Sequence, residues 1–482
     1  MSETNLKRQM LSGVFYTAVA RYSGIVISLV VMGVLARLLT PDDFGIVAIA
    51  TVFINFFQIF TNIGLSAAIV QYKELTNRQV NEIYMFTVWM GILLTLLFFL
   101  SSWPIAAYYE DSRLVPIVQC LSVSLFFAAA GIVPNALFSR DKRFQFIAWR
   151  TLTIQIITGL VSIVAALCGA GLYTLVIQSV LSGALLYFIS LRSYPQSFLP
   201  CSGIDSIRPI WGYSLYQFLF NTVIYCTRNL DKMLVGRYMG LAPLGYYEKS
   251  YRLMMLPLQN LTHVLTPVLH PLLSDYQQSS RRLGEINERM VHILALIGFP
   301  LSIYLYSCSR ELVLLCFGPQ WEASVPAFKI LALSCGFQIV TSSSGSFFQS
   351  YNDTRGMFLC GLFTALVSCS GYALSLWVCP TIEGFAWSLL IACLLSFIQC
   401  YWQLYRTSFH RPLYLLYRQL VSPLILTLLI GMSFWPFTHW IADWPLLVQL
   451  AAKSILCLLI SMAFLYLSGE WRILKELRNF KR

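Results

Sequence analysis

The chain has 482 residues, of which 57% are hydrophobic and only 11% are charged. A soluble globular protein carries about 25% charged residues, so this composition excludes a large soluble enzyme and a nucleic-acid-binding protein and indicates a membrane protein. The 33 Lys and Arg exceed the 21 Asp and Glu, giving a net charge of +12, and these charges lie in short clusters between long apolar runs.

Long apolar runs occupy most of the chain. A helix needs about 20 apolar residues to cross the roughly 30 Å of hydrocarbon in a bilayer. By this measure the sequence predicts fourteen membrane-spanning helices, with no connection long enough to form a soluble domain. In chain order these spans are 11–39, 44–71, 82–109, 114–139, 146–168, 172–191, 209–238, 243–273, 290–317, 324–350, 357–379, 383–405, 419–441 and 445–468.

The connections between these spans differ in charge. With the N-terminus placed in the cytoplasm, most Lys and Arg fall in the inner connections, and only Arg37, Arg113, Arg237 and Arg310 fall in the outer ones. Positive residues prefer the cytoplasmic side of a membrane. The sequence therefore predicts a multi-pass protein of the cytoplasmic membrane with both termini in the cytoplasm.

One motif occurs twice. Residues 37–45 (RLLTPDDFG) end the first span and open the second, and residues 237–245 (RYMGLAPLG) do the same for the seventh and eighth. Duplicated halves are common in transporters. The sequence predicts an all-α fold of two pseudo-symmetric six-helix lobes followed by two further helices. The predicted domains are 1–193, 208–405 and 419–468, with a basic cytoplasmic tail at 469–482.

The seventh span carries a polar stripe. Six of its side chains are spaced by three or four residues, which places them on one helical face. They are Ser214, Gln217, Asn221, Tyr225, Arg228 and Lys232. Asp231 lies three residues after Arg228, so it can neutralise part of this charge.

Three other spans carry similar stripes. The first span has Thr17, Arg21, Gly24 and Ser28, and the second has Thr51, Asn55, Gln58 and Asn62. The eighth span carries Glu248, Lys249, Arg252, Gln259 and His263, with Glu248 and Arg252 spaced as an i, i+4 pair.

Ionisable side chains inside a bilayer are costly unless they are paired or hydrated. If the four striped helices border one another, they line one water-filled cavity. Five cations (Arg21, Arg228, Lys232, Lys249 and Arg252) and two carboxylates (Asp231 and Glu248) leave it with an excess charge of +3. Arginine donates two parallel hydrogen bonds to phosphate, so an anionic solute or headgroup suits such a cavity. The structural alternative is that these groups form ion pairs and polar contacts between helices.

The candidate substrate-binding residues are therefore drawn from the four stripes. They are Arg21, Arg228, Lys232, Arg252, Asn55, Gln58, Asn62, Gln217 and Asn221, with Asp231 and Glu248 as charge-balancing or coupling groups. The sequence contains no phosphate-binding loop of the Walker type, no Gly-x-Ser-x-Gly, no His-Glu-x-x-His and no Cys-x-x-Cys. We therefore expect no catalytic residue, no metal site and no cofactor, and we expect a protein that is not an enzyme.

These motifs resemble the polysaccharide-transport branch, the Wzx-type oligosaccharide flippases, of the multidrug/oligosaccharidyl-lipid/polysaccharide exporter superfamily. The stretches that carry the resemblance are 37–45, 228–236 (RNLDKMLVG), 244–247 (LGYY) and 257–260 (PLQN). The resemblance implies a flippase that moves undecaprenyl-pyrophosphate-linked repeat units from the inner to the outer leaflet by alternating access. These units serve O-antigen, capsule or exopolysaccharide synthesis, and the implied partners are this lipid-linked oligosaccharide, membrane lipids and the polysaccharide polymerase machinery.

Two other functions within the superfamily are alternatives. A cation-coupled multidrug exporter needs carboxylates at mid-depth, whereas Asp43 and Glu82 lie at the edges of their spans. A flippase for a lipid-linked cell-wall precursor carries a similar anionic headgroup, so the charge pattern does not separate it from a polysaccharide flippase.

Overall fold

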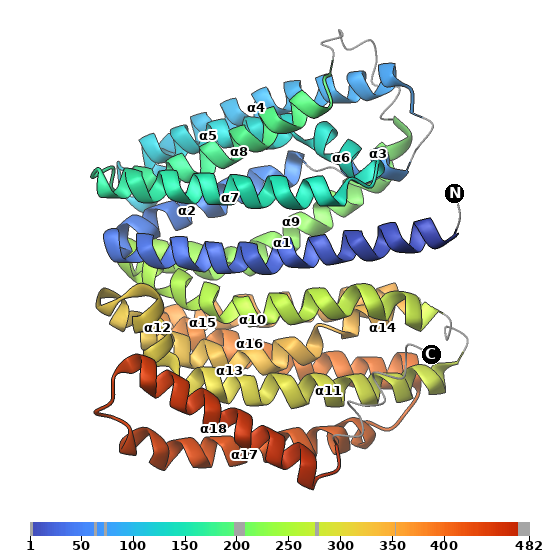
Figure 1. Ribbon diagram of the computed structural model, residues 1–482, viewed down its shortest axis with the longest axis vertical. Coiled ribbons are helices and arrows are strands. Elements are labelled where there is room, and N and C mark those ends of the chain that lie inside the picture. Colours follow the sequence, from blue (N-terminus) through green and yellow to red (C-terminus); the bar gives the residue numbers. More distant parts are fainter. Residues whose placement is uncertain are drawn as a thin grey trace. The chain divides into compact units, whose positions relative to one another are not determined.

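The computed structural model describes residues 3–61, 65–71, 75–196, 208–274, 279–351 and 353–470 (Figure 1). This part of the chain forms helices and contains no strand, which confirms the predicted all-α class. The α-helices are α1 (Glu3–Leu38), α2 (Pro41–Thr61), α3 (Leu65–Gln71), α4 (Asn77–Tyr109), α5 (Leu114–Ala130), α6 (Ile132–Arg140), α7 (Phe144–Leu167), α8 (Tyr173–Ser193), α9 (Arg208–Tyr238), α10 (Leu241–Ser274), α11 (Ser280–Ser307), α12 (Ser309–Phe317), α13 (Val325–Thr341), α14 (Ser344–Ser350), α15 (Thr354–Val378), α16 (Ile382–Gln403), α17 (Tyr414–Trp440) and α18 (Leu446–Leu467). A 3₁₀ turn, η2 (Pro319–Ser324), precedes α13, and a π-helical turn, η3 (Leu404–Phe409), follows α16.

Twelve helical segments in the described residues are long and apolar enough to cross a membrane. Each overlaps one of the fourteen predicted spans, so the chain is a multi-pass membrane protein. The other two predicted spans, 209–238 and 243–273, coincide with α9 and α10, which are 31 and 34 residues long. They are not among the twelve, and the count of fourteen stays a prediction. The basic tail from residue 471 onward lies outside the described residues.

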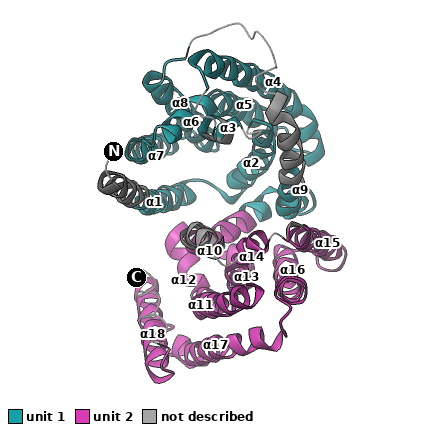
Figure 2. Ribbon diagram, turned by 90° about the vertical axis from the view of Figure 1, so that its right-hand side faces the viewer, with its two compact units in different colours: residues 1–245 teal, residues 246–482 magenta. Residues whose placement is uncertain are grey.

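The chain divides into two compact units, residues 1–245 (unit 1) and 246–482 (unit 2), shown in teal and magenta in Figure 2. In unit 1, α4 packs on α5, α1 packs on α7, and α2 packs on α9. The short helices α3 and α6 lie side by side at the end of this unit where α1 begins (Figure 1). In unit 2, α11 packs against both α13 and α17, and α15 packs against α16.

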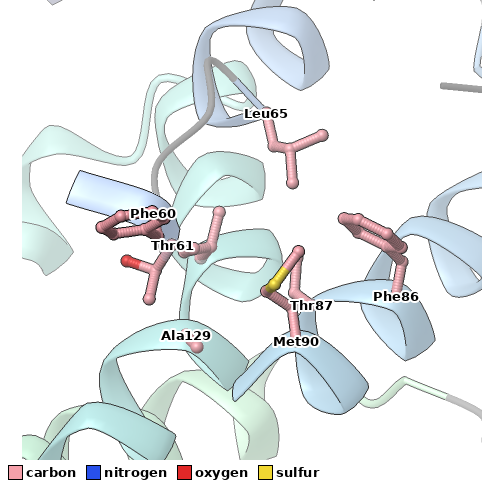
Figure 3. A pocket seen from close by; sticks show the side chains of 8 residues that line it. Phe60, Thr61, Leu65, Phe86, Thr87, Met90 and Ala129 are labelled. Carbon is pink, nitrogen blue, oxygen red and sulfur yellow. The ribbon is translucent and has the colours of Figure 1, made fainter. Parts of the chain in front are cut away.

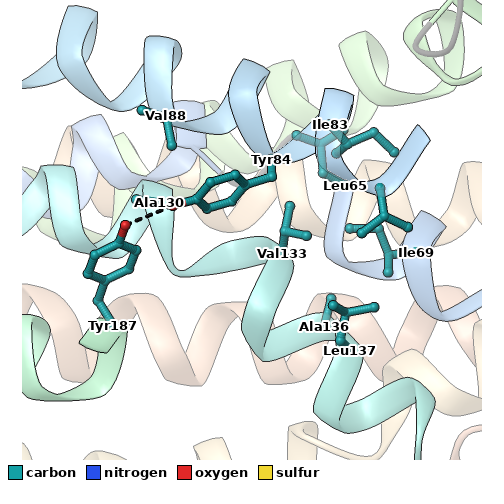
Figure 4. Packing of buried hydrophobic residues seen from close by; sticks show 11 residues of the cluster. Leu65, Ile69, Ile83, Tyr84, Val88, Ala130, Val133, Ala136, Leu137 and Tyr187 are labelled. Atoms are coloured by element: carbon teal, nitrogen blue, oxygen red, sulfur yellow. Dashed lines mark hydrogen bonds between the residues drawn. The ribbon is translucent and has the colours of Figure 1, made fainter. Parts of the chain in front are cut away.

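One core of unit 1 joins α3, α4, α6 and α8 with the end of α5. The hydroxyls of Tyr84 and Tyr187 lie 2.8 Å apart and point toward one another across this core (Figure 4). Both tyrosines are buried, so each hydroxyl satisfies the polar group of the other where no water reaches it. The surrounding side chains are aliphatic, including Ile69, Val133 and Leu137.

The fourth predicted span is a broken helix. The sequence predicts one helix over 114–139, whereas α5 ends at Ala130 and α6 starts at Ile132. Pro134 has no backbone N–H to donate to the carbonyl of Ala130, and its ring clashes with that carbonyl. The break at Gly131 separates these two residues, so proline and glycine together account for it.

The two copies of the repeated motif contact each other reciprocally within unit 1. A Cβ atom added to Gly45 would lie 1.9 Å from the backbone oxygen of Leu241, and one added to Gly245 would lie 2.0 Å from that of Pro41. Pro41 and Leu241 occupy the same place in the two copies, as do Gly45 and Gly245. Only glycine allows so close a crossing of two backbones.

A buried ion pair anchors α18 in unit 2. The Nζ atom of Lys453 lies 2.6 Å from Oε1 of Glu311 and donates to the carbonyl of Ser307 at 2.9 Å. Both side chains are almost fully covered, with 1% and 5% exposure. The pair joins α18 to α12 across 142 residues of sequence, and no helical spacing indicates it.

Candidate functional site

The predicted polar stripes of the second and seventh spans lie on neighbouring helices. The hydroxyl of Tyr225 in α9 donates to the carbonyl of Val52 in α2 at 2.6 Å. The Tyr225 ring also lies 6.3 Å from the ring of Phe56. On α2, Asn55 and Gln58 are half-buried, so this helix presents amide side chains close to its contact with α9.

The charged residues of α9 point in different directions. Arg228 is exposed and makes no hydrogen bond or ion pair with a described residue. Asp231 is 1% exposed, and its Oδ1 accepts a hydrogen bond from the backbone N–H of Lys232 at 2.8 Å. Lys232 is half-buried. Asp231 therefore lies inside the helical packing of unit 1, while the guanidinium of Arg228 is accessible.

The charged residues of α10 also differ in how exposed they are. Arg252 is exposed and forms no ion pair with a described residue, so the predicted pair with the half-buried Glu248 is not formed. Lys249 is 2% exposed, and its Nζ lies 5.6 Å and 5.7 Å from the ring centroids of Phe317 and Trp321. This aromatic environment holds the ammonium inside unit 2.

Two of the charged residues counted for the predicted cavity, Lys249 and Asp231, are covered by the protein. The sequence pattern counted Lys249 among the cations that line the cavity, but the side chain is enclosed by aromatic rings. Asp231 is equally covered, so without these two residues the four cations Arg21, Arg228, Lys232 and Arg252 exceed the one remaining carboxylate, Glu248, by 4 − 1 = +3. The sign of the predicted excess is unchanged.

The stripe of α1 serves two roles. Gly24 faces α7, where its backbone carbonyl accepts a hydrogen bond from Nε2 of Gln155 at 2.9 Å. Arg21 is exposed and makes no hydrogen bond or ion pair with a described residue. Part of the predicted stripe thus holds α1 against α7, and Arg21 is left as its accessible cation.

The accessible arginines lie far from the ends of their helices. At 1.5 Å per residue, Arg228 lies about 15 Å before the end of α9, and Arg252 lies about 17 Å after the start of α10. These distances are close to half of a hydrocarbon core of about 30 Å. On the same measure Arg21 lies about 26 Å before the end of α1. An accessible guanidinium at mid-depth needs water or an anion beside it.

Three of the predicted binding residues cannot be placed. Asn62 and the side chains of Gln217 and Asn221 lie outside the described residues. The same holds for the side chains of Thr17, Ser214 and His263.

Charged side chains gather around the α4–α5 turn, at the end of unit 1 opposite the start of α1. Arg113 pairs with Asp42 at 2.6 Å and with Asp111 at 2.7 Å. Arg237 pairs with Glu110 at 2.8 Å. The hydrogen bond from the Arg113 guanidinium lowers the pKa of the Asp111 carboxyl below its ordinary value. These pairs tie the start of α2 and the end of α9 to the turn, a role that the charge count of the connections did not indicate.

A small apolar pocket also lies in unit 1 (Figure 3). Phe60, Leu65, Phe86, Thr87 and Met90 line it, and they leave no enclosed space that a water-sized molecule could occupy. Pockets that bind organic ligands are larger and contain converging polar groups. This pocket is too small and too apolar to hold a sugar. In the described part of the chain, no group of three His, Cys, Asp or Glu side chains is arranged to hold a metal ion.

Comparisons with known proteins bear on the same helices. The model of the family described as "Polysaccharide biosynthesis protein" matches residues 34–326, more than half of the chain. The teichuronic acid biosynthesis protein TuaB of Bacillus subtilis is 25% identical over 71% of this chain and 71% of its own length. The succinoglycan biosynthesis transport protein ExoT of Rhizobium meliloti is 21% identical over 83% of this chain and 82% of its own. Among solved structures, the lipid II flippase MurJ in an inward closed conformation matches with a TM-score of 0.74 at 13% identity, covering 94% of this chain and 99% of that one. At that identity the likeness shows a shared fold.

Proposed function

The chain belongs to the family of polysaccharide biosynthesis proteins, and we propose that it is a flippase for lipid-linked oligosaccharides. Its passenger is a polysaccharide repeat unit linked to undecaprenyl pyrophosphate. The protein moves this unit from the inner to the outer leaflet of the bacterial cytoplasmic membrane. The printed names of the relatives, which include a transport protein for succinoglycan biosynthesis, support this class of passenger.

One observation carries the proposal. Arg228 and Arg252 are exposed, have no partner among the described residues, and lie about three turns from the nearer end of long helices. A buried structural ion pair looks different, as the enclosed pair of Lys453 and Glu311 shows. Accessible guanidinium groups at this depth suit a passenger that brings phosphate into the membrane, since the guanidinium fork binds two phosphate oxygens at once.

The proposed mechanism is alternating access between two lobes, residues 1–193 and 208–405, with 419–468 as an added helix pair. Arg21, the accessible cation nearest the cytoplasmic side, meets the pyrophosphate first. Arg228, Lys232 and Arg252 then hold it at mid-depth, while the amides of Asn55, Gln58, Asn62, Gln217 and Asn221 accommodate sugars. Asp231 and Glu248 balance this charge or couple it to an ion. The lipid tail remains in the bilayer throughout.

The same proposal sets the orientation and the partners. Both termini lie in the cytoplasm, because the connections on that side carry most of the Lys and Arg. The polysaccharide polymerase machinery receives the flipped unit on the outer side. No step of the mechanism uses a cofactor or a covalent intermediate.

In the described part of the first lobe, the drug-exporter alternative lacks coupling carboxylates at mid-depth. Asp43 accepts hydrogen bonds from the backbone and hydroxyl of Thr40 in the first turn of α2. Glu82 pairs with Arg78 in the second turn of α4. Both acidic groups lie at helix ends, where they stabilise the local structure.

Depletion in a host that makes a surface polysaccharide tests the function. We expect undecaprenyl-linked repeat units to accumulate in the inner leaflet while polymer at the surface falls. Accumulation of a lipid-linked cell-wall precursor, with unchanged polysaccharide, would instead identify the precursor flippase. Altered dye efflux with unchanged polysaccharide would identify the drug exporter. Either of these two results contradicts the proposal.

A further inference from the structure

A second group of cations lies at the end of unit 1 where α6 stops, α7 starts and α8 stops. We call Arg140, Lys142, Arg143, Arg150 and Arg192 the α6–α7 basic cluster. The single carboxylate in this segment is Asp141, which leaves a charge of 5 − 1 = +4. Asp141 is already engaged: its Oδ1 lies 3.8 Å from Nε of Arg140, and its Oδ2 accepts a hydrogen bond from the hydroxyl of Tyr194.

Arg150 is the most deeply placed member of the cluster. It is 8% exposed, and its Nη1 donates only to neutral groups, the amide oxygen of Asn135 at 2.9 Å and the hydroxyl of Ser190 at 2.6 Å. Its Nε is buried and has no partner in the described residues, and the same is true of Nη1 of Arg140. A covered guanidinium without a carboxylate is unfavourable unless an anion binds beside it.

Aromatic rings hold these guanidinium groups in place. The Cζ atom of Arg150 lies 5.0 Å from the ring centroid of Phe138, which stacks on Phe146 at 4.9 Å. The Cζ atom of Arg143 lies 5.4 Å from the ring centroid of Tyr194, which meets Phe138 edge-on at 4.8 Å. The cations are therefore arranged before any ligand arrives, which lowers the entropy cost of binding.

The neighbouring surface is the kind that faces lipid headgroups. Phe144, Phe146 and Trp149 are 41%, 40% and 57% exposed in the first turns of α7. Aromatic side chains next to Lys and Arg at the start of a span are typical of the membrane interface. The N-terminus of α7 adds a favourable dipole for an anion.

We propose that the α6–α7 basic cluster binds the phosphate of an anionic phospholipid of the surrounding leaflet. The exposed Arg143 and the partly covered Arg140 contact the phosphate, and Arg150 supplies charge from beneath. This site is separate from the passenger arginines on α1, α9 and α10, and it does not depend on the proposed transport function. A bound lipid here holds the ends of α6, α7 and α8 together.

Native mass spectrometry of the purified full-length protein tests the site. The protein is titrated with phosphatidylglycerol or with phosphatidylcholine, and bound lipids are counted. We expect at least one tightly bound phosphatidylglycerol in the wild type, and at least a tenfold weaker first binding step in R143Q and in R150Q. The control is R78Q, which removes an exposed cation from the same end of unit 1 that already pairs with Glu82.

Two further measurements keep the test decisive. If R150Q does not fold, the double variant R140Q/R143Q replaces it, because both side chains reach the surface. Equal phosphatidylglycerol binding by the wild type and this double variant would overturn the proposal. It would also be overturned if inorganic phosphate raised the unfolding midpoint as much as the lipid does, since the ligand would then be a free anion.

Discussion

The buried ion pair of Lys453 and Glu311 is costly to disturb. Both groups are enclosed at a separation of 2.6 Å, and Oε2 of Glu311 has no hydrogen-bond partner. Removal of one partner leaves an uncompensated charge, whereas replacement of both with apolar groups of similar size is often neutral. The pair thus fixes where α18 docks on α12 more than it adds net stability.

We predict that Lys453→Met destabilises the protein by about 3–5 kcal/mol, because the Glu311 carboxylate is left buried without its cation. The midpoint of thermal unfolding, followed by tryptophan fluorescence in detergent, measures this loss. The double variant Lys453→Met/Glu311→Leu should recover most of it. Lys329→Met, at an exposed lysine over the ring of Tyr306, serves as the control and should change little. Equal losses in the single and double variants would show that packing, and not charge, causes the effect.

Asp111 makes the stability of unit 1 depend on pH. Its pKa is lowered by the hydrogen bond from Arg113, so its carboxylate binds its proton less readily in the folded state than in the unfolded one. Such a group stabilises the fold above the unfolded pKa, and this stabilisation is lost as the pH falls through the folded pKa.

The measurement that checks this is the unfolding midpoint of the wild type and of Asp111→Asn between pH 7 and pH 3. The difference in unfolding midpoint between the two proteins should be largest at neutral pH. It should shrink below about pH 4, the ordinary pKa range of an aspartate. A difference that stays constant down to pH 3 would mean that the Asp111–Arg113 hydrogen bond does not favour the carboxylate.

At the scale of elements, the two repeated motifs cross too closely to admit a side chain at either glycine. Gly45 and Gly245 each lie against a backbone carbonyl of the other copy, at distances that leave no room for a side chain. The sequence indicated the duplication from spacing alone. It could not indicate that the two copies touch, because that depends on how α2 and the start of α10 cross.

We predict that Gly45→Ala and Gly245→Ala each lower the unfolding midpoint strongly, since overpacking costs about 1–3 kcal/mol or more where a backbone must move. The matched control is Gly361→Ala in α15, where an added Cβ meets nothing within 4 Å. Because alanine favours a helix, this control should be neutral or stabilising by up to about 1 kcal/mol. If all three variants behave alike, the crossing is looser than described.

For the whole molecule, the length of apolar runs predicted the twelve membrane-length segments, because the bilayer fixes how long a span must be. The α9 and α10 spans are less apolar because they carry charged rows.

For the site, spacing showed which residues share a helical face but not what that face meets. Gly24 meets Gln155, and Lys249 meets Phe317, partners far away in sequence. Whether such a side chain faces a cavity or a core depends on the tertiary packing, which helical spacing does not predict.

The most direct test of the account is the rate at which purified protein in liposomes flips an undecaprenyl-pyrophosphate-linked oligosaccharide. Replacement of Arg228 with Ala should lower this rate roughly tenfold or more, because a charge-assisted hydrogen bond contributes about 1.5–3 kcal/mol. Lysine at this position should restore part of the rate. Arg310→Ala, which removes a surface ion pair with Glu322, should leave it unchanged. A folded Arg228→Ala protein that flips the passenger at the wild-type rate would contradict the central claim that accessible arginines within the membrane bind its pyrophosphate.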